Sequence, residues 1–397
     1  MIEPVARDRE LSRKLLHPRR AAVPINEPVA HPIYQTAAWQ FRDIAQMDEV
    51  FAGEVPNAAT YGTIGLPNNV TLERLVADIE GTEAAVAGNS GMAVLSAALL
   101  TLLTPGDTVI VSTQGFGWTL GLLRDLAQWG IRHVQIDLTD LDALYGALQD
   151  GPQLVIAETI SNPRLRVPDL RRVAEMAHES GALLLVDNTF ASPYTATPAA
   201  LGADVVVESL TKFMSGHTDV VLGAIAGSAL LIEKVRDRMV RLGSIAAPMD
   251  SWLALRGLQT LVVRMERATG TAGVLAEWLA HLPRVREAIY PGLRQHPDHE
   301  LASRVLSGGY GAMVSIVLDA DRNAMNAFTG ALELVTLVHS LGGTATTVSH
   351  PASSTHRLLS PMELEAAGLP MGFLRISVGL EHPGDLIDDF QQAFDRM

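Results

Sequence analysis

The sequence predicts an α/β fold in which a large domain with a mostly parallel sheet is followed by a smaller C-terminal α/β domain. Between about residues 70 and 225, short apolar segments alternate with helix-like segments. Strands that are apolar on both faces and separated by amphipathic helices are typical of a parallel sheet with helices on both sides. The chain of 397 residues is also too long for one ordinary core, and its pattern changes near residue 255.

The elements of the large domain follow from apolar spacing and from helix-breaking residues. Helical spacing covers 72–79 and stops at Gly81, and a buried helix is expected over 93–103. A third helix begins at Pro168-Asp169 and ends before Gly181, a residue suited to a left-handed C-cap. The expected buried strands are the fully apolar segments 109–111, 154–157, 182–186 and 205–207.

From residue 255 onward the pattern indicates a second, smaller domain. One long helix is expected over 255–282, followed by strands over 313–318 and 373–378, with glycine-containing turns between these elements. The predicted parts of the chain are an N-terminal arm over 1–58 that reaches a neighbouring subunit, a large cofactor-binding domain over 59–254 and the C-terminal α/β domain over 255–397.

Composition excludes several classes of protein. The net charge of −14 argues against binding to nucleic acid or to an anionic membrane surface, because such partners require a dense basic face. No apolar run reaches the roughly 18 residues of a membrane span. The absence of cysteine excludes disulfides, thiolate metal sites and a cysteine nucleophile.

Targeting and metal-binding signals are also missing. Glu3, Asp8 and Glu10 lie among the N-terminal arginines and no apolar segment follows, which argues against a targeting peptide, so we expect a cytoplasmic protein. His350 and His356 lie close in sequence but have no acidic or thiol partner nearby, so we expect no metal. The sequence contains no G-x-G-x-x-G, P-loop or H-E-x-x-H motif.

Polar residues follow the buried strands at the edge where ligands bind in α/β sheets. They are Glu158, Asp187 and Ser209, and Lys212 comes three residues after Ser209. A lysine that follows a buried strand is partly desolvated, which lowers its pKa and favours the neutral amine that forms an imine. Ser209 and Thr211 can donate hydrogen bonds to a phosphate beside that imine. Taken alone, Lys212 is better explained as an exposed lysine at a strand end.

Two further segments complete the pattern. Asp187 ends an apolar strand, and burial of its carboxylate is costly unless a cation such as a protonated pyridine nitrogen neutralises it. The segment Gly88-Asn-Ser90-Gly91-Met92 leads into a helix, whose free amides and dipole bind phosphate. A lysine and an aspartate in this arrangement are the protein's contribution to pyridoxal phosphate (PLP) chemistry. The sequence therefore predicts a PLP-dependent enzyme that carries its cofactor as a Schiff base on Lys212.

At these residues the chain closely resembles the Cys/Met metabolism family of PLP-dependent enzymes. That family includes methionine γ-lyase, cystathionine γ-synthase and γ-lyase, and the O-acylhomoserine sulfhydrylases. The resemblance is highly specific and runs from about Pro28 to the C-terminus. The motifs that carry it are Ser90-Gly-Met92, Glu158-Thr-Ile-Ser-Asn162-Pro163, Asp187-Asn-Thr189, Ser209-Leu-Thr-Lys212-Phe-Met-Ser-Gly-His217, Ser340-Leu-Gly-Gly343, His350-Pro-Ala-Ser-Ser-Thr-His356 and Leu374-Arg375-Ile-Ser-Val-Gly-Leu-Glu381.

The resemblance implies the PLP-dependent transferase fold of type I, similar to aspartate aminotransferase, and a homotetramer of active dimers with sites shared between two chains. It implies that Lys212 binds the cofactor and moves protons, while Asp187 holds the pyridine nitrogen. Arg375 would bind the carboxylate of an amino-acid substrate, because a bidentate arginine suits a carboxylate. The other residues implied at the cofactor are Tyr61 from the neighbouring subunit, Gly91, Met92, Phe116, Thr189, Ser209 and Thr211, and those at the substrate are Trp118, Asn162, His339 and Ser340.

Four positions depart from the family pattern. Thr63 stands where the family has an arginine, so the neighbouring chain supplies no guanidinium to the phosphate. Phe116 stands where the family usually has a tyrosine; it can stack on the pyridine ring but cannot protonate a leaving group. Trp118 occupies a position that is normally small, which predicts a narrow, apolar pocket. His339 precedes Ser340 where cystathionine enzymes often carry glutamate.

These departures lead to a functional hypothesis. Loss of a general acid typically costs about 10²–10⁴ in rate when the leaving group must be protonated. We therefore expect a specialised γ-lyase for an L-amino acid with a good leaving group at Cγ, such as a chlorinated, alkyne-forming substrate of secondary metabolism. It is equally open that Tyr61 or a bound water supplies the proton to the leaving group in place of the missing tyrosine. The alternatives are a methionine γ-lyase, an O-acylhomoserine sulfhydrylase that replaces the Cγ substituent, and a PLP-binding paralogue without catalytic activity.

Overall fold

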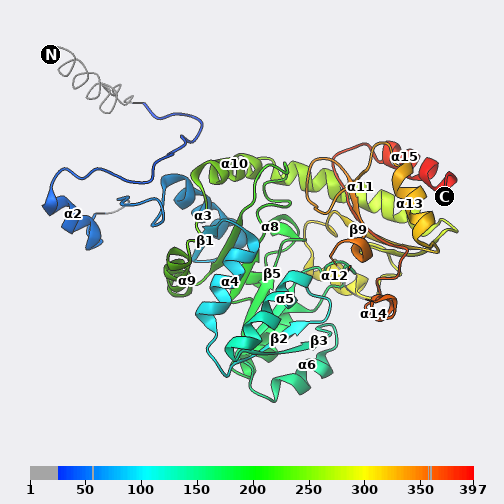
Figure 1. The fold of residues 1–397 in the computed structure, drawn as a ribbon, viewed down its shortest axis with the longest axis horizontal. Coiled ribbons are helices and arrows are strands. Elements are labelled where there is room, and N and C mark those ends of the chain that lie inside the picture. The colour runs from blue at the N-terminus through cyan, green and yellow to red at the C-terminus, as the bar shows by residue number, and fades with distance from the viewer. Residues whose placement is uncertain (1–25, 56–57, 356, 358–359) are drawn as a thin grey trace, which may run out of the picture. The chain divides into compact units, whose positions relative to one another are not determined.

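The computed structural model describes residues 26–55, 58–355, 357 and 360–397 (Figure 1). The chain divides into two units, Met1–Pro32 and Ile33–Met397, and all helices and strands of the described residues lie in the second unit. Much of the predicted arm over 1–58 lies outside the described residues, so its reach to a neighbouring subunit stays a prediction. No helix in the described ranges combines the length and apolar character that a bilayer span requires.

The larger of two sheets has seven strands in the order β1-β7-β6-β5-β4-β2-β3. β7 runs antiparallel to both of its neighbours, and the strands from β6 to β3 are parallel. The predicted mostly parallel sheet, with all four expected strands, is confirmed. Its strands are β1 (Ala84–Gly88), β2 (Thr108–Ser112), β3 (Arg132–Ile136), β4 (Leu154–Glu158), β5 (Leu183–Asp187), β6 (Val205–Glu208) and β7 (Gly223–Gly227).

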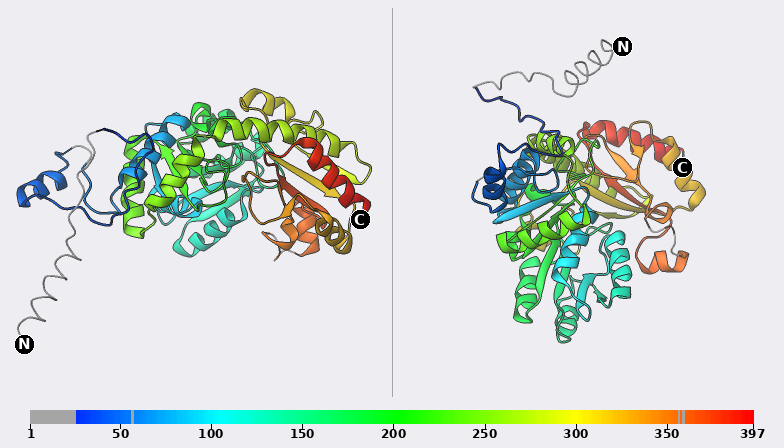
Figure 2. Two further views of the ribbon diagram at one scale, coloured as in Figure 1. Left: turned by 90° about the horizontal axis from the view of Figure 1, so that it is seen from above. Right: turned by 60° about the vertical axis from the view of Figure 1, so that its left-hand side comes forward.

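Helices cover both faces of this sheet (Figure 2). α4, α5 and α9 pack against one face, where they bury residues such as Val109 and Val207. α3 and α10, together with α6 and α7, pack against the other face and bury residues such as Val155 and Val206. Because successive residues of a strand point to opposite faces, strands between two helical layers must be apolar throughout. The helices are α2 (Ile44–Phe51), α3 (Pro67–Glu80), α4 (Gly91–Leu102), α5 (Gly117–Leu126), α6 (Leu141–Leu148), α7 (Leu170–Glu179), α8 (Ser192–Thr195), α9 (Ala229–Leu242) and α10 (Pro248–Leu258).

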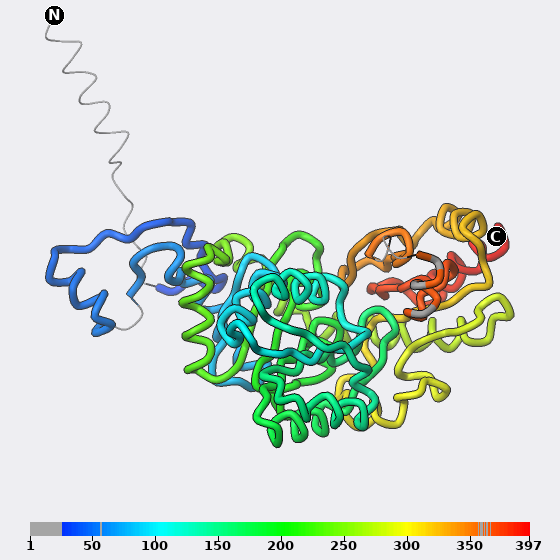
Figure 3. Tube along the Cα trace, turned by 60° about the horizontal axis from the view of Figure 1, so that its bottom comes forward, coloured from blue at the N-terminus to red at the C-terminus, as the bar shows by residue number. Residues whose placement is uncertain are grey.

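The second sheet has five strands in the order β10-β11-β12-β9-β8 and is built from the C-terminal third of the chain (Figure 3). Both expected strands, 313–318 and 373–378, are present as β9 and β12. The domain boundaries predicted at residues 58 and 254 stay predictions. The elements are α11 (Leu261–Ala280), β8 (Val285–Ile289), α12 (His299–Val305), β9 (Met313–Leu318), α13 (Arg322–Ala331), β10 (Thr336–Leu337), β11 (Thr347–Ser349), α14 (Pro361–Ala366), β12 (Phe373–Ser377) and α15 (Pro383–Asp395).

The predicted single helix over 255–282 is wrong, because two helices, α10 and α11, occupy this region. The chain leaves helical geometry at Thr260, where φ is −111° and ψ is 7°. The Thr260 hydroxyl donates to Gly257 O (3.1 Å) and accepts a hydrogen bond from Arg264 Nε (3.0 Å), and these bonds stabilise the break. No proline marks the break in the sequence, and apolar residues continue on both sides of it.

Two buried carboxyl groups contact each other on the α3 side of the large sheet. Glu80 ends α3 and Glu208 ends β6, and the charge of Glu80 adds to the burial that raises the pKa of Glu208. Asn188 Nδ2 donates to Glu80 Oε1 (3.3 Å). Burial raises the pKa of Glu80 to about 7 and holds the pKa of Glu208 well above its usual range, and no described cation lowers either pKa. The pair therefore retains a proton near neutral pH.

We expect Glu80→Gln to stabilise the protein at pH 8 but not at pH 5. A carboxyl whose pKa is raised in the folded state favours folding at low pH, and this contribution is lost as the pH rises from 4.5 through about 7. Glutamine keeps an acceptor for Asn188 and does not titrate. At pH 8 the variant should gain roughly 1–3 kcal/mol, seen as a rise in the thermal unfolding midpoint. Glu179→Gln, at an exposed position of α7, is the control, and a pH-independent effect of Glu80→Gln would contradict this account.

Candidate active site

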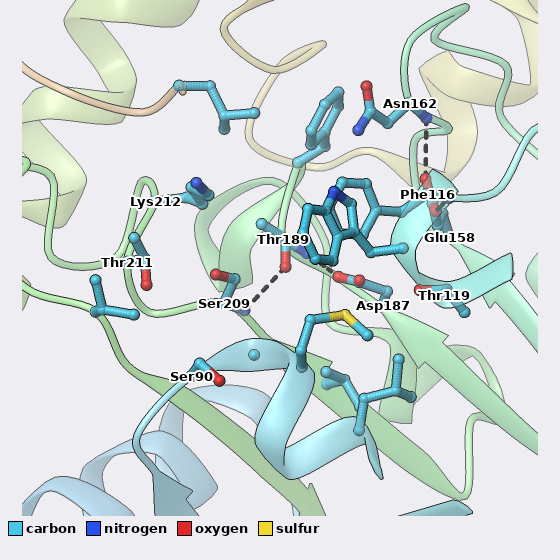
Figure 4. Close-up of a pocket in the computed structure, with 18 of the residues that line it drawn as sticks. Ser90, Phe116, Thr119, Glu158, Asn162, Asp187, Thr189, Ser209, Thr211 and Lys212 are labelled. Atoms are coloured by element: carbon cyan, nitrogen blue, oxygen red, sulfur yellow. Dashed lines mark hydrogen bonds between the residues drawn. The ribbon is translucent and has the colours of Figure 1, made fainter. Parts of the chain in front are cut away.

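A pocket of about 350 Å³ lies at the carboxyl ends of β4, β5 and β6, beside the N-termini of α4 and α5 (Figure 4). Its volume is at the small end of the range for small-molecule sites. The predicted site residues that line it are Gly91, Met92, Phe116, Trp118, Asn162, Asp187, Thr189, Ser209, Thr211, Lys212 and His339. The lining residues that the sequence did not assign to the site are Ser90, Leu95, Thr119, Glu158, Ile160, Phe190, Val207, Val221 and Leu341.

Lys212 lies in the turn that follows β6, and its side chain lines the pocket. Its Nζ donates a hydrogen bond to Ser340 Oγ (3.2 Å). Burial, with the positive charge of Arg375 as a smaller cause, lowers the pKa of Lys212. This is the desolvation that the sequence predicts, and the neutral amine that it favours is the form that condenses with an aldehyde.

Asp187 is the last residue of β5 and lies opposite Glu158 of β4 in the parallel register. One of its carboxylate oxygens accepts a hydrogen bond from Thr189 N (3.0 Å). Burial raises the pKa of Asp187, and no described cation lowers it. A buried carboxylate without a paired cation fits the protonated ring nitrogen of PLP, because that nitrogen would supply the missing positive charge.

The first turn of α4 forms one end of the pocket. Ser90 is the N-cap, and its Oγ accepts a hydrogen bond from Ala93 N (3.1 Å). Gly91 lies against Ser209 so closely that a Cβ on Gly91 would be 3.1 Å from Ser209 Cβ. Ser209 N donates to Thr189 Oγ1 (2.9 Å), and this bond fixes the turn that follows β6. The amides at the start of α4 and the Ser209 hydroxyl thus converge in a cradle suited to a phosphate group.

β7 lies directly behind this cradle. A Cβ on Gly223 would lie 2.5 Å from both Gly91 N and Ser90 O, so a larger residue would displace the start of α4. The Thr211 hydroxyl donates to Leu222 O (3.1 Å) and accepts from Leu222 N (3.0 Å). Its hydrogen is therefore bound to the backbone, and the predicted donation from Thr211 to a phosphate would require this hydroxyl to rotate.

The aromatic residues predicted at the site differ in their exposure. Phe116 is the N-cap of α5, lines the pocket and donates its backbone N–H to the Glu158 carboxylate. Trp118 is 62% exposed, so it lies at the pocket mouth and does not fill the interior. Tyr61 is 52% exposed and does not line the pocket of its own chain. Its contribution to a neighbouring subunit's site stays a prediction.

Arg375 lies on β12 and is buried beside Asn162. Its Nη1 donates to Asn162 Oδ1 (2.9 Å) and its Nη2 approaches Ser340 O (3.5 Å). Its Nε is buried and has no hydrogen-bond partner in the described part of the chain. Burial lowers the pKa of Arg375 to about 10. A buried guanidinium with an unpaired donor is suited to bind a ligand carboxylate.

The histidine pair considered in the sequence does not form a described metal centre. His350 contacts Ser353 Oγ and Met371 O, each at 2.7 Å, whereas His356 lies outside the described residues. Within the ranges that the structure covers, no group of three or more His, Cys, Asp or Glu side chains could hold a metal ion.

Comparison with known proteins decides the family. Residues 14–395 match the model of the family described as Cys/Met metabolism PLP-dependent enzyme. The chain belongs to this family. It is therefore a PLP-dependent enzyme of trans-sulfuration type with the fold of type I, as the sequence predicts. Lys212, Asp187 and the phosphate cradle show that the residues present fit this cofactor.

Relatives with different reactions are about equally similar. The chain is 37% identical over 373 residues to an L-methionine gamma-lyase of Fusobacterium nucleatum subsp. polymorphum, covering 93% of this chain and 94% of that protein. It is 38% identical over 362 residues to an O-succinylhomoserine sulfhydrylase of Pseudomonas aeruginosa, covering 91% and 89%. The crystal structure of cystathionine gamma synthase from Xanthomonas oryzae pv. oryzae in complex with cystathionine matches with a TM-score of 0.88, 37% identity and 93% coverage of both chains. Membership of the family thus identifies the cofactor but not the substrate.

We expect Gly223→Ala to weaken PLP binding by about tenfold or more, because the added methyl group would displace the amide of Gly91. The matched control is Gly273→Ala on α11, where a Cβ would have no atom within 4 Å. Spectroscopic titration of the apo-proteins with PLP measures both affinities. Wild-type affinity in Gly223→Ala would show that the cradle is not the phosphate site.

Proposed function

We propose that this member of the family catalyses γ-elimination from an L-amino acid with a good leaving group at Cγ, such as a chlorinated substrate that yields an alkyne in secondary metabolism. The observation that carries the proposal is Phe116, which lines the pocket where the family pattern has a tyrosine. No tyrosine is among the described residues that line the pocket. Chloride leaves as a stable anion and does not need such an acid, whereas the more basic methanethiolate that methionine releases is helped by one.

The residues proposed to hold PLP all line the pocket. Lys212 would bind its aldehyde carbon, Asp187 would face its ring nitrogen, and Phe116 would stack on the ring. The phosphate would lie in the cradle of Gly91, Met92 and Ser209, with Thr189 and, after rotation of its hydroxyl, Thr211 as supporting residues. When bound, PLP withdraws electrons from the substrate and makes protons near Cα acidic.

Arg375 would bind the substrate, and Lys212 would transfer protons on it. Arg375, with Asn162 and Ser340 beside it, would bind the substrate carboxylate through its unpaired donor. The lowered pKa of Lys212 favours the neutral amine, and this amine would take a proton from Cα and move one at Cβ. Asp187, as a carboxylate, would keep a proton on the ring nitrogen. Trp118 and His339 at the pocket wall would contact the side chain of the substrate.

We also propose a homotetramer of active dimers in which the arm and Tyr61 complete the site of a neighbouring copy. The exposure of Tyr61 in a single chain is consistent with such a role. In this arrangement Thr63 adds no charge to the phosphate, and Tyr61 or a bound water would be the alternative source of a proton for the leaving group.

A second candidate is γ-replacement, in which a thiol or sulfide takes the place of the leaving group. The similarity to a sulfhydrylase supports it as directly as the similarity to a methionine γ-lyase supports elimination. Screening γ-substituted amino acids for release of ammonia, 2-oxo acid and chloride, with and without added thiol, separates the two. Product formation that depends on the thiol would identify a transferase.

We expect Lys212→Ala to abolish the visible absorption band of bound PLP and all turnover, because Lys212 is the one lysine among the described residues that line the pocket. The matched control is Lys234→Ala, which removes the one other lysine among the described residues, at an exposed position of α9. An absorption band that persists in Lys212→Ala would show that another group holds the cofactor.

We expect Phe116→Tyr to raise turnover of methionine by about tenfold or more while turnover of a γ-chloro amino acid changes little. The tyrosine would restore an acid that helps a poor leaving group and is not needed by chloride. Steady-state release of 2-oxo acid and of chloride measures the two reactions. A wild-type enzyme that does not react with any γ-halo amino acid would contradict the proposed substrate class.

A further inference from the structure

Glu158 is a buried carboxylate that lines the pocket, although no role follows for it from the sequence. It is the last residue of β4, and its neighbour in the parallel register is Asp187. Burial, to which the charge of Asp187 adds, holds the pKa of Glu158 well above its usual range. No described cation lowers that pKa, and the groups that oppose the shift are two backbone N–H donors.

The two oxygens of Glu158 bind two different segments. Oε1 accepts the N–H of Phe116, at the start of α5, and Oε2 accepts the N–H of Asn162 (2.9 Å), in the segment after β4 (Figure 4). A carboxylate can accept both bonds because it has no donor of its own. A glutamine in the same place would turn an NH₂ group toward one of the two N–H donors. The site therefore requires a group with two acceptor atoms.

One further hydrogen bond joins Asn162 to Arg375, the residue proposed to bind the substrate carboxylate. Asn162 Oδ1 accepts from Arg375 Nη1 (2.9 Å), so the backbone that Glu158 holds carries the side chain that orients the guanidinium. On the other side, Glu158 fixes the backbone of Phe116, whose ring lines the pocket. One carboxylate thus fixes the spacing between the aromatic wall and the arginine.

We propose that Glu158 is a positioning residue, which sets the place of Arg375 through Asn162 and the place of the Phe116 ring through its backbone. This inference rests on the proposed role of Arg375 in binding the substrate carboxylate. In this scheme Glu158 acts only through the two backbone donors that it binds. Loss of Glu158 would weaken binding of the substrate carboxylate more than it would slow the chemical step.

The test uses the PLP-loaded enzyme and glycine, an amino acid with the required carboxylate and no leaving group. Glycine binding is followed by the change in the visible spectrum, which does not depend on turnover. We expect Glu158→Gln to raise the Kd of glycine by about tenfold, because one of the two bonds is lost. Glu158→Asp keeps the charge but is too short to reach both donors, so it should raise the Kd as well. In turnover, KM should rise more than kcat falls.

The matched control is Asp389→Asn in the C-terminal part of the chain. Asp389 is likewise a buried carboxylate that accepts backbone N–H bonds, from Glu333 (2.8 Å), Leu334 (3.0 Å) and Val335 (2.8 Å), and it does not line the pocket. Asp389→Asn should lower the unfolding temperature but leave the Kd of glycine unchanged. An equal rise in Kd in Asp389→Asn would assign the effect to general destabilisation and overturn the inference.

Arg375→Lys separates this inference from the proposed function on which it rests. If Arg375→Lys and both Glu158 variants weaken glycine binding, the positioning role is supported. If Arg375→Lys weakens binding while Glu158→Gln and Glu158→Asp bind glycine as the wild type does, the inference fails and the proposed substrate site stands. If Arg375→Lys has no effect, the proposed substrate site fails and the inference fails with it. Should the glutamine variant not fold, Glu158→Asp decides the outcome alone.

Discussion

Parallel strands end at the same edge of a sheet, and this constraint brings the chemistry of the protein together. β4, β5 and β6 lie side by side and in register, so their last residues or the turns after them meet, although more than fifty residues of sequence separate Glu158 from Lys212. The connecting helices return the chain to the opposite edge each time. Polar side chains are thereby confined to one edge of the sheet, while the strands themselves bury apolar residues on both faces.

The site that results contains buried ionisable groups, and the described residues place no group of opposite charge against them. Asp187 and Glu158 have carboxylates with no described cation beside them, and Arg375 has a guanidinium held by an amide oxygen and a carbonyl. Burial of unpaired charge is unfavourable in the isolated chain. A ligand with a positive ring nitrogen at one end and an amino-acid carboxylate at the other would pair with both kinds of group. The cost of burying these groups and the chemistry of the ligand are thus two aspects of one arrangement.

Local sequence patterns were sufficient for much of the fold and for the centre of the site. The apolar strands, the helix after Asp169 and the lysine at 212 are signalled within about ten residues of chain, and the structure has each of them. The break at Thr260 was not predicted, because it depends on hydrogen bonds made by that residue and not on a proline. The bonds of Glu158 to Phe116 and Asn162 could not be predicted from the sequence either, since they join segments that only the folded chain brings together.

The cradle at the start of α4 has a consequence for the conditions in which the enzyme can work. It consists of backbone amides, hydroxyl groups and glycines in close contact, and Lys212 is the one lysine or arginine among the described residues that line the pocket. Attraction between separated charges is weakened by dissolved ions, whereas short contacts between dipoles and an anion, made where water is excluded, depend far less on them. An enzyme that holds its cofactor in this way should remain loaded across a wide range of salinity.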